Sequence, residues 1–388
     1  MKFNVLLIAI LSLLMFSCID NQLPTINVVY DEDISWDEKD ECKIIYSDSY
    51  RSFEANAGVK RRGGISRQYY KHSFTIEFYN KFPLLGLPKD DDWILNANCI
   101  DKTFMRHKIS YDIFREMNSN NIAPKSDYIN LSLNGEYEGL YILMQKMNAK
   151  TLGVDKKDDM AMVFKEPPIF YKNKLEFVRD SLNYYDQRFP KIYKLDKTKY
   201  IESLKDFLFN ASDAEFAKNI GKWFDIENVI DWHIILLFTN NSDGIMKNFF
   251  LYKIDSETPL RFALWDYDHS FGRDGDNEFN MLDRVLDCNR SVLLKRLSEI
   301  PETKYLPKLK KRWFELREAD IISYDNFAYH IEKNDNIIRK HVEKNFEKWP
   351  VNSEWYYDDN NYEQELEIML KYAKIRIKQL DEYFEGID

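Results

Sequence analysis

Cysteines are scarce in this chain of 388 residues, and the sequence has no internal repeat or low-complexity tract. Of the four cysteines, Cys18 belongs to the N-terminal segment, which leaves Cys42, Cys99 and Cys288 at spacings unlike those of a zinc site. These three permit at most one disulfide, so neither a disulfide framework nor a structural zinc is expected. Beyond the N-terminal segment, no run approaches the roughly 18 apolar residues that span a bilayer.

The chain also lacks an excess of positive charge. Its 55 lysines and arginines face 65 aspartates and glutamates, which gives a formal net charge of −10 and a pI near 5.3. Because nucleic-acid backbones require a clustered basic surface, nucleic acid is not expected as a main partner. The acidity is compatible with a basic protein substrate.

The N-terminus has the composition of a bacterial lipoprotein signal. Lys2 precedes the apolar run Phe3–Phe16, and the small residue Ser17 precedes Cys18. We therefore expect residues 1–18 to direct export and Cys18 to carry a lipid anchor that tethers the protein to the membrane of a bacterial cell envelope, on the periplasmic or the outer surface. The residues before Ser17 make an imperfect lipobox, so a signal peptide cut elsewhere stays open.

The rest of the pattern predicts an α+β protein with two lobes, joined to the signal by a linker at residues 19–25. Alternating apolar runs predict a β-rich N-lobe over residues 26–147, with a hairpin turn at Asn134-Gly135. Apolar residues at spacings of three and four predict a mainly helical C-lobe over residues 148–388. Strands are expected at 27–30, 42–46, 58–61, 73–78, 128–133, 140–144 and 160–165, and helices at 103–117, 201–209, 213–223, 226–238, 293–297, 305–316, 327–346 and 362–384.

The most informative segment is Asn240–Gly272, which places Asp243 and Asn248 before two apolar runs and Asp266 and Asp268 after them. The runs predict a β-hairpin, and a hairpin returns the chain to its starting point, so the four side chains are expected to converge. Metal-assisted phosphoryl transfer needs oxygen ligands for Mg²⁺ and a separate carboxylate that orients and deprotonates a hydroxyl. The spacing matches that of protein kinases.

A purely structural interpretation of the same residues is also open. Asp and Asn are common turn residues, so Asp243-Gly244 also fits a tight turn. Asp266 and Asp268 favour the functional interpretation because they directly follow the apolar run Phe262–Trp265. Carboxylates near the interior are costly unless a cation or strong hydrogen-bond donors accompany them.

These residues resemble those of the CotH-like spore-coat kinases. Members of that family pair a segment like DG…KN with a segment like WDxDxSFG, matched here by Asp243 to Asn248 and by Trp265 to Gly272. The resemblance covers roughly residues 60–272. The further matching positions are Arg62-Gly63, Ser66, Asp92–Leu95, Asp101–Thr103, Met105-Arg106 and Leu133–Tyr141.

The resemblance implies a two-lobed, atypical kinase fold and transfer of the ATP γ-phosphoryl group to a protein Ser or Thr hydroxyl. In this hypothesis Asp243 is the base, Asn248 and Asp266 hold Mg²⁺ or Mn²⁺, and Asp268 is a second ligand or supports the first. Arg62 is expected to contact the nucleotide. A glycan or another hydroxyl compound stays open as the acceptor.

Lys102 and Arg106 are the remaining candidates for nucleotide contact. They lie near the start of the helix expected at residues 103–117, where a cation and helix-end amides can meet phosphate. An equally open alternative pairs Arg106 with a nearby carboxylate such as Asp92.

Four residues depart from the family pattern, namely Gly64, Ile65, Glu77 and His107. Glu77 places negative charge where a phosphate-facing strand prefers positive charge. The departures leave open a second hypothesis, a kinase-like surface lipoprotein that binds a protein or glycan without turnover. Hydrolysis at a two-metal site is disfavoured, because no second acidic or histidine cluster accompanies the first.

Overall fold

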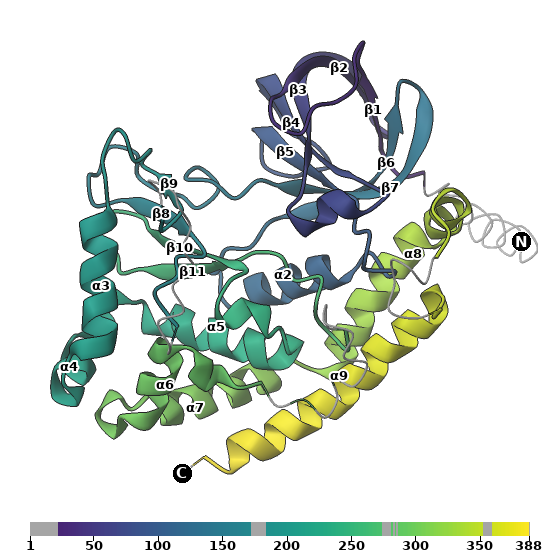
Figure 1. Ribbon diagram of the computed structural model, residues 1–388. Coiled ribbons are helices and arrows are strands. Elements are labelled where there is room, and N and C mark those ends of the chain that lie inside the picture. Colours follow the sequence, from purple (N-terminus) through teal and green to yellow (C-terminus); the bar gives the residue numbers. More distant parts are fainter. Residues whose placement is uncertain are drawn as a thin grey trace, which may run out of the picture.

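The computed structural model describes residues 22–171, 184–273, 281, 284, 286–351 and 359–387. The predicted signal peptide, Cys18 and the first part of the linker lie outside this range. A β-barrel lies at one end of the molecule, and helices with a small sheet form the rest (Figure 1). None of the helices in the described ranges is long and apolar enough to cross a membrane.

Seven strands form a closed barrel in the order β1-β2-β3-β4-β5-β7-β6. β1 closes the barrel by pairing in parallel with β6, which places Ile26 opposite Leu131. Alternate side chains of each strand fill the interior, so Phe74, Ile76 and Phe78 of β4 are buried in one core. The strands are β1 (Thr25–Val29), β2 (Asp40–Ser47), β3 (Ser52–Arg62), β4 (Ser73–Phe82), β5 (Asp90–Asn96), β6 (Ser126–Leu133) and β7 (Glu136–Gln145).

The barrel corrects the predicted architecture. The α+β class is right, but the prediction of a two-lobed kinase-like fold is wrong, because a closed seven-stranded barrel differs from the N-lobe of a kinase. Strand periodicity carries no information on the pairing of β1 with β6, which are far apart in the sequence. The predicted hairpin between β6 and β7 is confirmed, and Asn134 and Gly135 adopt the left-handed φ angles of 48° and 87° that such a turn requires.

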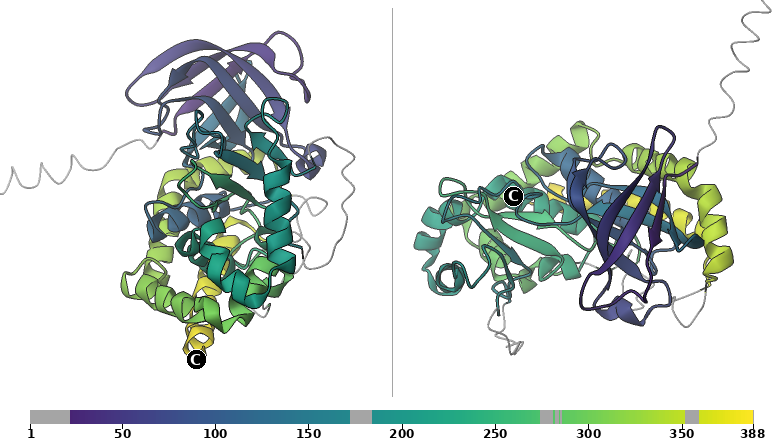
Figure 2. Two further views of the ribbon diagram at one scale, coloured as in Figure 1. Left: turned by 90° about the vertical axis from the view of Figure 1, so that its left-hand side faces the viewer. Right: turned by 90° about the horizontal axis from the view of Figure 1, so that it is seen from above.

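The helical region comprises α2 to α9 and an antiparallel sheet in the order β11-β10-β8-β9. The barrel is stacked on this region (Figure 2), and α5 is its central helix, buried from Asn228 to Thr239. Every helix predicted from the sequence is present. The elements are α2 (Arg106–Met117), β8 (Met162–Lys165), β9 (Gln187–Phe189), α3 (Thr198–Asn210), α4 (Asp213–Trp223), α5 (Ile226–Thr239), β10 (Phe249–Lys253), β11 (Arg261–Leu264), α6 (Val292–Glu299), α7 (Tyr305–Glu318), α8 (Tyr324–Lys348) and α9 (Tyr362–Glu385).

β7 joins the two hydrophobic cores because its side chains alternate between them. Tyr141 and Leu143 are packed inside the barrel, whereas Leu140, Ile142 and Met144 belong to the core of the helical region. The outer face of this part of the barrel is therefore an internal surface, and the barrel is anchored to the helices that carry the Asn240–Gly272 segment.

Lys71 fastens the barrel to α8. Its buried ammonium group donates to the carbonyl oxygens of Ala97 and Leu140, at 2.9 and 2.6 Å, and to Asn345 Oδ1 at 2.9 Å. The fit is close, since a Cβ at Gly139, whose φ is 143°, would lie 2.8 Å from Asn345 Oδ1. Burial lowers the pKa of Lys71 to about 7.

This pKa predicts a specific pH dependence of stability. Between pH 7 and 9 the unfolded lysine, with its ordinary pKa near 10.5, binds more protons than the buried one. The free energy of unfolding of the wild type relative to Lys71→Met should therefore rise with pH by up to about 1.4 kcal/mol per pH unit, and fall as pH drops towards 7. Urea denaturation at pH 7, 8 and 9 measures it.

The matched control is Lys81→Met, because Lys81 is an exposed lysine on β4, the strand that begins just after Lys71. The difference in free energy of unfolding between Lys81→Met and the wild type should not change over this pH range. A wild-type advantage over Lys71→Met that is equally flat would show that Lys71 keeps its ordinary pKa.

Candidate functional site

The two ends of the β10–β11 hairpin meet, as the sequence predicts. The Trp265 N–H donates to the Asn248 carbonyl oxygen at 3.0 Å, and Asn248 Nδ2 donates to the Asp266 carbonyl oxygen at 2.8 Å. Asn248 precedes β10 directly and Asp266 follows β11 after one residue. The asparagine and the first aspartate of the later pair therefore lie side by side.

Both residues adopt left-handed backbone conformations, with φ near 61° at Asn248 and at Asp266. Asparagine tolerates this conformation more readily than most residues, but for either residue it costs free energy that surrounding contacts must offset. At Asp266 one such contact is a hydrogen bond from its N–H to the Tyr111 hydroxyl, at 2.9 Å. The bend aims the Asp266 side chain out of the loop, where 54% of its surface is exposed.

The loop that follows β11 is fastened to one face of α2. The Tyr267 N–H donates to His107 Nδ1 at 2.9 Å, and Arg106 Nε donates to the Ser270 carbonyl oxygen at 3.0 Å. The Ser270 hydroxyl closes the loop by donating to the Tyr267 carbonyl oxygen at 2.9 Å. α2 therefore fixes the positions of Asp266 and Asp268, although the sequence gives no sign of this contact.

Arg106 lies in a buried network of charges and is only 1% exposed. Its guanidinium donates to Asp101 Oδ1 at 2.6 Å and to Glu365 Oε2 at 2.9 Å, and Arg273 pairs with Glu365 as well. Lys102 is also buried and donates to the Asn360 carbonyl oxygen at 2.8 Å. Both predicted nucleotide contacts thus use their donors within the protein, and Arg106 pairs with Asp101 and Glu365 instead of Asp92.

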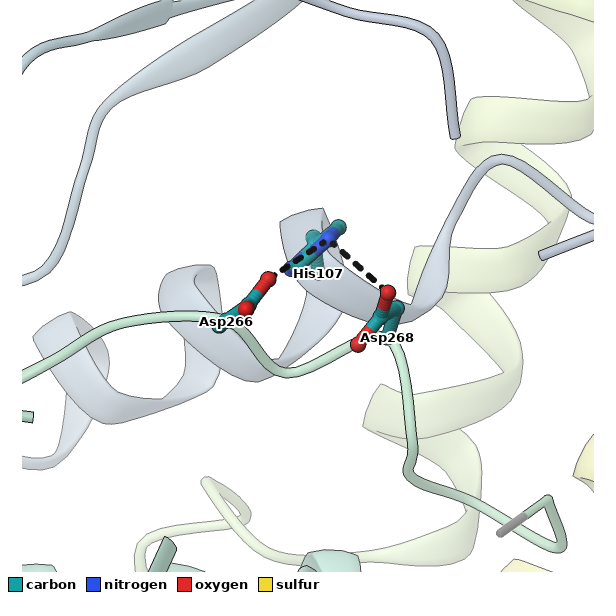
Figure 3. A group of neighbouring side chains, drawn as sticks. All are labelled: His107, Asp266 and Asp268. Atoms are coloured by element: carbon teal, nitrogen blue, oxygen red, sulfur yellow. Dashed lines mark ion pairs between the residues drawn. The ribbon is translucent and has the colours of Figure 1, made fainter. Parts of the chain in front are cut away.

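His107, Asp266 and Asp268 form an open cluster beside this network (Figure 3). His107 Nε2 is 3.9 Å from Asp266 Oδ1 and 3.9 Å from Asp268 Oδ2, and the three atoms lie within 4.8 Å of one another. Asp268 is less exposed than Asp266, at 20% of its side-chain surface. Two carboxylates and an imidazole therefore border one small space.

The two carboxylates titrate differently. Desolvation by surrounding protein atoms and the charge of Asp268 raise the pKa of Asp266, and His107, Arg62 and Lys165 only partly oppose this. Burial also opposes ionisation of Asp268, but the charge of His269 and hydrogen bonds from backbone N–H groups outweigh it, so the pKa of Asp268 is lowered. A bound cation would relieve the repulsion within the pair.

The donor set fits a hard divalent cation. Two carboxylate oxygens share the space, and Asn248, whose Nδ2 donates to the Asp266 carbonyl oxygen, carries an amide oxygen beside them. Oxygen ligands of this kind suit Mg²⁺ and Mn²⁺. Asn248, Asp266 and Asp268 are the residues that would hold such an ion.

Asp243 lies at the start of a short 3₁₀ turn, Asp243–Ile245, that follows α5. Its carboxylate pairs with Lys247 Nζ at 2.9 Å. Burial opposes the charging of Lys247, but Asp243, Glu166 and Asp266 outweigh it and raise the pKa of Lys247. One lysine thus interacts with Asp243 at the start of the segment and with Asp266 at its end.

Two cations stand over the Trp265 ring beside Asp266. The Arg62 guanidinium lies 5.6 Å and Lys165 Nζ 6.0 Å from the ring centroid. Burial lowers the pKa of Arg62, and the charge of Asp266 opposes that shift. The structure therefore brings the predicted residue Arg62 to the cluster, at the end of β3 where the barrel faces the loop.

Sequence reasoning missed Lys165 and Glu166. β8 pairs with β10 and places Lys165 opposite Phe250, two residues from Asn248. Glu166 Oε1 accepts a hydrogen bond from the Asn248 N–H at 3.1 Å. Only the non-local pairing of β8 with β10 brings these residues to the site, and no local sequence signal indicates it.

With this geometry in place, comparison with known proteins identifies the chain. Residues 59–380 match the model of the family described as CotH kinase protein, so the chain belongs to this family. Among characterised relatives it is similar to the inner spore coat protein H of Bacillus subtilis (strain 168). The two are 25% identical over 248 residues, which cover 63% of this chain and 67% of that protein. The predicted family is confirmed, and membership indicates a kinase-like function.

The network around Arg106 predicts which glutamate of α9 supports the site. Glu365→Gln should lower the free energy of unfolding by about 3–5 kcal/mol, because it leaves Arg273 without its buried counter-charge and Arg106 with Asp101 alone. Chemical denaturation followed by tryptophan fluorescence measures the change.

Glu363→Gln provides a matched control on the same turn of α9. Glu363 also pairs with an arginine, Arg339, at 2.9 Å, but its side chain is 58% exposed. Loss of this exposed ion pair should lower the free energy of unfolding by less than about 1 kcal/mol. Equal effects of the two substitutions would show that the Glu365 network contributes no more than a surface ion pair.

Proposed function

We propose that this protein is an ATP-dependent phosphotransferase acting on a protein Ser or Thr hydroxyl. One observation supports the proposal above all. Three elements meet here: the β10–β11 hairpin, α2 and the end of β3. They bring together Asp266 and Asp268, whose oxygens can bind a cation, and Arg62, whose guanidinium can donate to phosphate. Phosphoryl transfer depends on positioning and on charge stabilisation, and both kinds of residue are needed for it.

Asn248, Asp266 and Asp268 would hold Mg²⁺ or Mn²⁺ together with ATP. The ion, when bound, neutralises charge on the phosphates. Arg62 and Lys165 carry positive charge beside the same carboxylates and would bind the phosphate oxygens, and their stacking on Trp265 restricts where they reach. Arg106 and Lys102 have a different part in this proposal, since Arg106 fixes the loop and Lys102 donates to the Asn360 carbonyl oxygen.

Asp243 is the proposed base. Its side chain is 39% exposed and so is open to an acceptor. The ion pair with Lys247 orients the carboxylate, and a carboxylate is a group that can accept a proton from a hydroxyl group.

We place this activity in the cell envelope. The relative from Bacillus subtilis is named as a protein of the inner spore coat, and the N-terminal sequence has the composition of an export signal. Lipid attachment at Cys18 remains a prediction.

Substitution of the two key aspartates tests the activity. Asp243→Asn and Asp266→Asn should each lower transfer of ³²P from ATP to an envelope extract or a generic Ser/Thr substrate by roughly 10²–10⁴-fold, because each removes a charge that acts on the reacting groups. The thermal midpoint should change little, since neither side chain is buried in a core.

Glu257→Gln is the control, because Glu257 is an exposed acid in the turn of the same hairpin. Full activity of Asp266→Asn would refute the assignment. Stabilisation of the wild type by ATP and Mg²⁺ without any transfer would favour the other hypothesis, a binding protein of the same family.

The two cations over Trp265 give a separate prediction. Arg62→Met and Lys165→Met should each raise the KM for ATP roughly tenfold or more, because each removes a charged donor to phosphate. Initial-rate measurements at varied ATP provide the test, with the exposed Lys156→Met as control. An unchanged KM in Lys165→Met would remove Lys165 from the nucleotide site.

A further inference from the structure

His107 is held in one tautomer by its neighbours. The ring is buried, with 4% of its side chain exposed, and Nδ1 accepts the Tyr267 N–H at 2.9 Å. The Tyr111 hydroxyl lies 3.2 Å from the same nitrogen. That hydroxyl accepts the Asp266 N–H at 2.9 Å.

A backbone N–H can only donate, so the nitrogen that receives it must present a lone pair. His107 Nδ1 therefore carries no proton. In neutral imidazole the proton then sits on Nε2, which makes Nε2 a donor. A histidine that ligates a metal through Nε2 needs the opposite arrangement, with Nδ1–H donating to an acceptor. The loop around Tyr267 offers a donor there instead.

The Nε2–H of His107 lies between Asp266 and Asp268 but is 3.9 Å from each, which is too long for a hydrogen bond. The donor is thus aimed into the space that the carboxylates border (Figure 3). An oxygen atom placed there would accept from Nε2 while it shares a cation with the carboxylates. The phosphate oxygens of a nucleotide meet both requirements.

We propose that His107 binds a phosphate oxygen of the nucleotide through Nε2–H and is not itself a metal ligand. This inference rests on the proposed function, and it assigns a specific contact within that site. It also separates the roles of the three residues that border the space, because Asp266 and Asp268 bind the cation and His107 binds the anion that accompanies it.

Substitution of His107 by asparagine or by glutamine distinguishes the roles of its two ring nitrogens. In His107→Asn the amide oxygen can take the place of Nδ1 and accept the Tyr267 N–H, but no atom replaces Nε2. In His107→Gln the amide nitrogen reaches further and can replace the Nε2–H donor. The first variant preserves the loop contact without the proposed phosphate contact, and the second restores the donor.

The inference predicts different effects on nucleotide and metal. His107→Asn should weaken ATP binding in the presence of Mg²⁺ roughly tenfold, which is the usual loss for a hydrogen bond to a charged group. His107→Gln should recover most of it. Titration calorimetry with Mn²⁺ alone should give the same affinity within about twofold for the wild type and both variants. Weaker Mn²⁺ binding in His107→Asn, or unchanged ATP binding in it, overturns the inference.

The tautomer itself is measured without any nucleotide. In ¹⁵N-histidine NMR spectra of the free protein, the signal that disappears in His107→Asn should show a protonated Nε2 and an unprotonated Nδ1. A protonated Nδ1 would overturn the inference about His107 but would leave the proposed function standing. A wild type that binds no ATP would overturn the proposed function and the phosphate contact with it, so the two failures are distinguishable.

Discussion

The position of the Asp266–Gly272 loop depends on one buried cation, the guanidinium of Arg106. It donates to Asp101, which lies five residues before α2, to Glu365 in the first turn of α9 and to the carbonyl oxygen of Ser270 in the loop. Taking these charges out of water is costly, and buried ion pairs seldom add much net stability. They require a single geometry, however, because a shift of any partner leaves a charge unpaired. The network therefore sets the position of the loop that carries the aspartates.

Two sets of charge lie side by side, and they differ in how they are balanced. In the buried set, Asp101 and Glu365 are matched by Arg106 and Arg273, and each charge has a partner within the protein. In the open set, the carboxylates of Asp266 and Asp268 face each other across a space, with His107 Nε2 beyond hydrogen-bonding distance. The first set is complete without a ligand. In the proposed function a cation and an anion would balance the second set, which is the distinction between a support and a binding site.

The sequence predicted those parts of the site that are local in the chain. A hairpin brings its own ends together, so the meeting of Asn248 with Asp266 followed from the spacing alone, and helix periodicity located α2 to α9. The contacts of His107, Lys165 and Glu365 could not be predicted, because they depend on pairing between segments distant in sequence. The closure of the barrel by β1 and β6 belongs to the same class. Local patterns specify elements, whereas the register between distant elements emerges only from the whole core.

Glu77, which departs from the family pattern, shows that contacts between distant segments also determine how a charge is balanced. In sequence it places a negative group on a strand that faces the site, which argues against phosphate binding. In the structure Glu77 lies in register with Gly58 and Asp92 on the outer face of the barrel. The absence of a side chain at Gly58 leaves room for Lys39, which crosses it and pairs with Glu77, and Lys146 pairs with Asp92 at 3.1 Å. Two lysines thus offset the two acids locally. Arg62 and Lys165 carry positive charge at the proposed nucleotide site, so Glu77 does not by itself indicate a decayed nucleotide site.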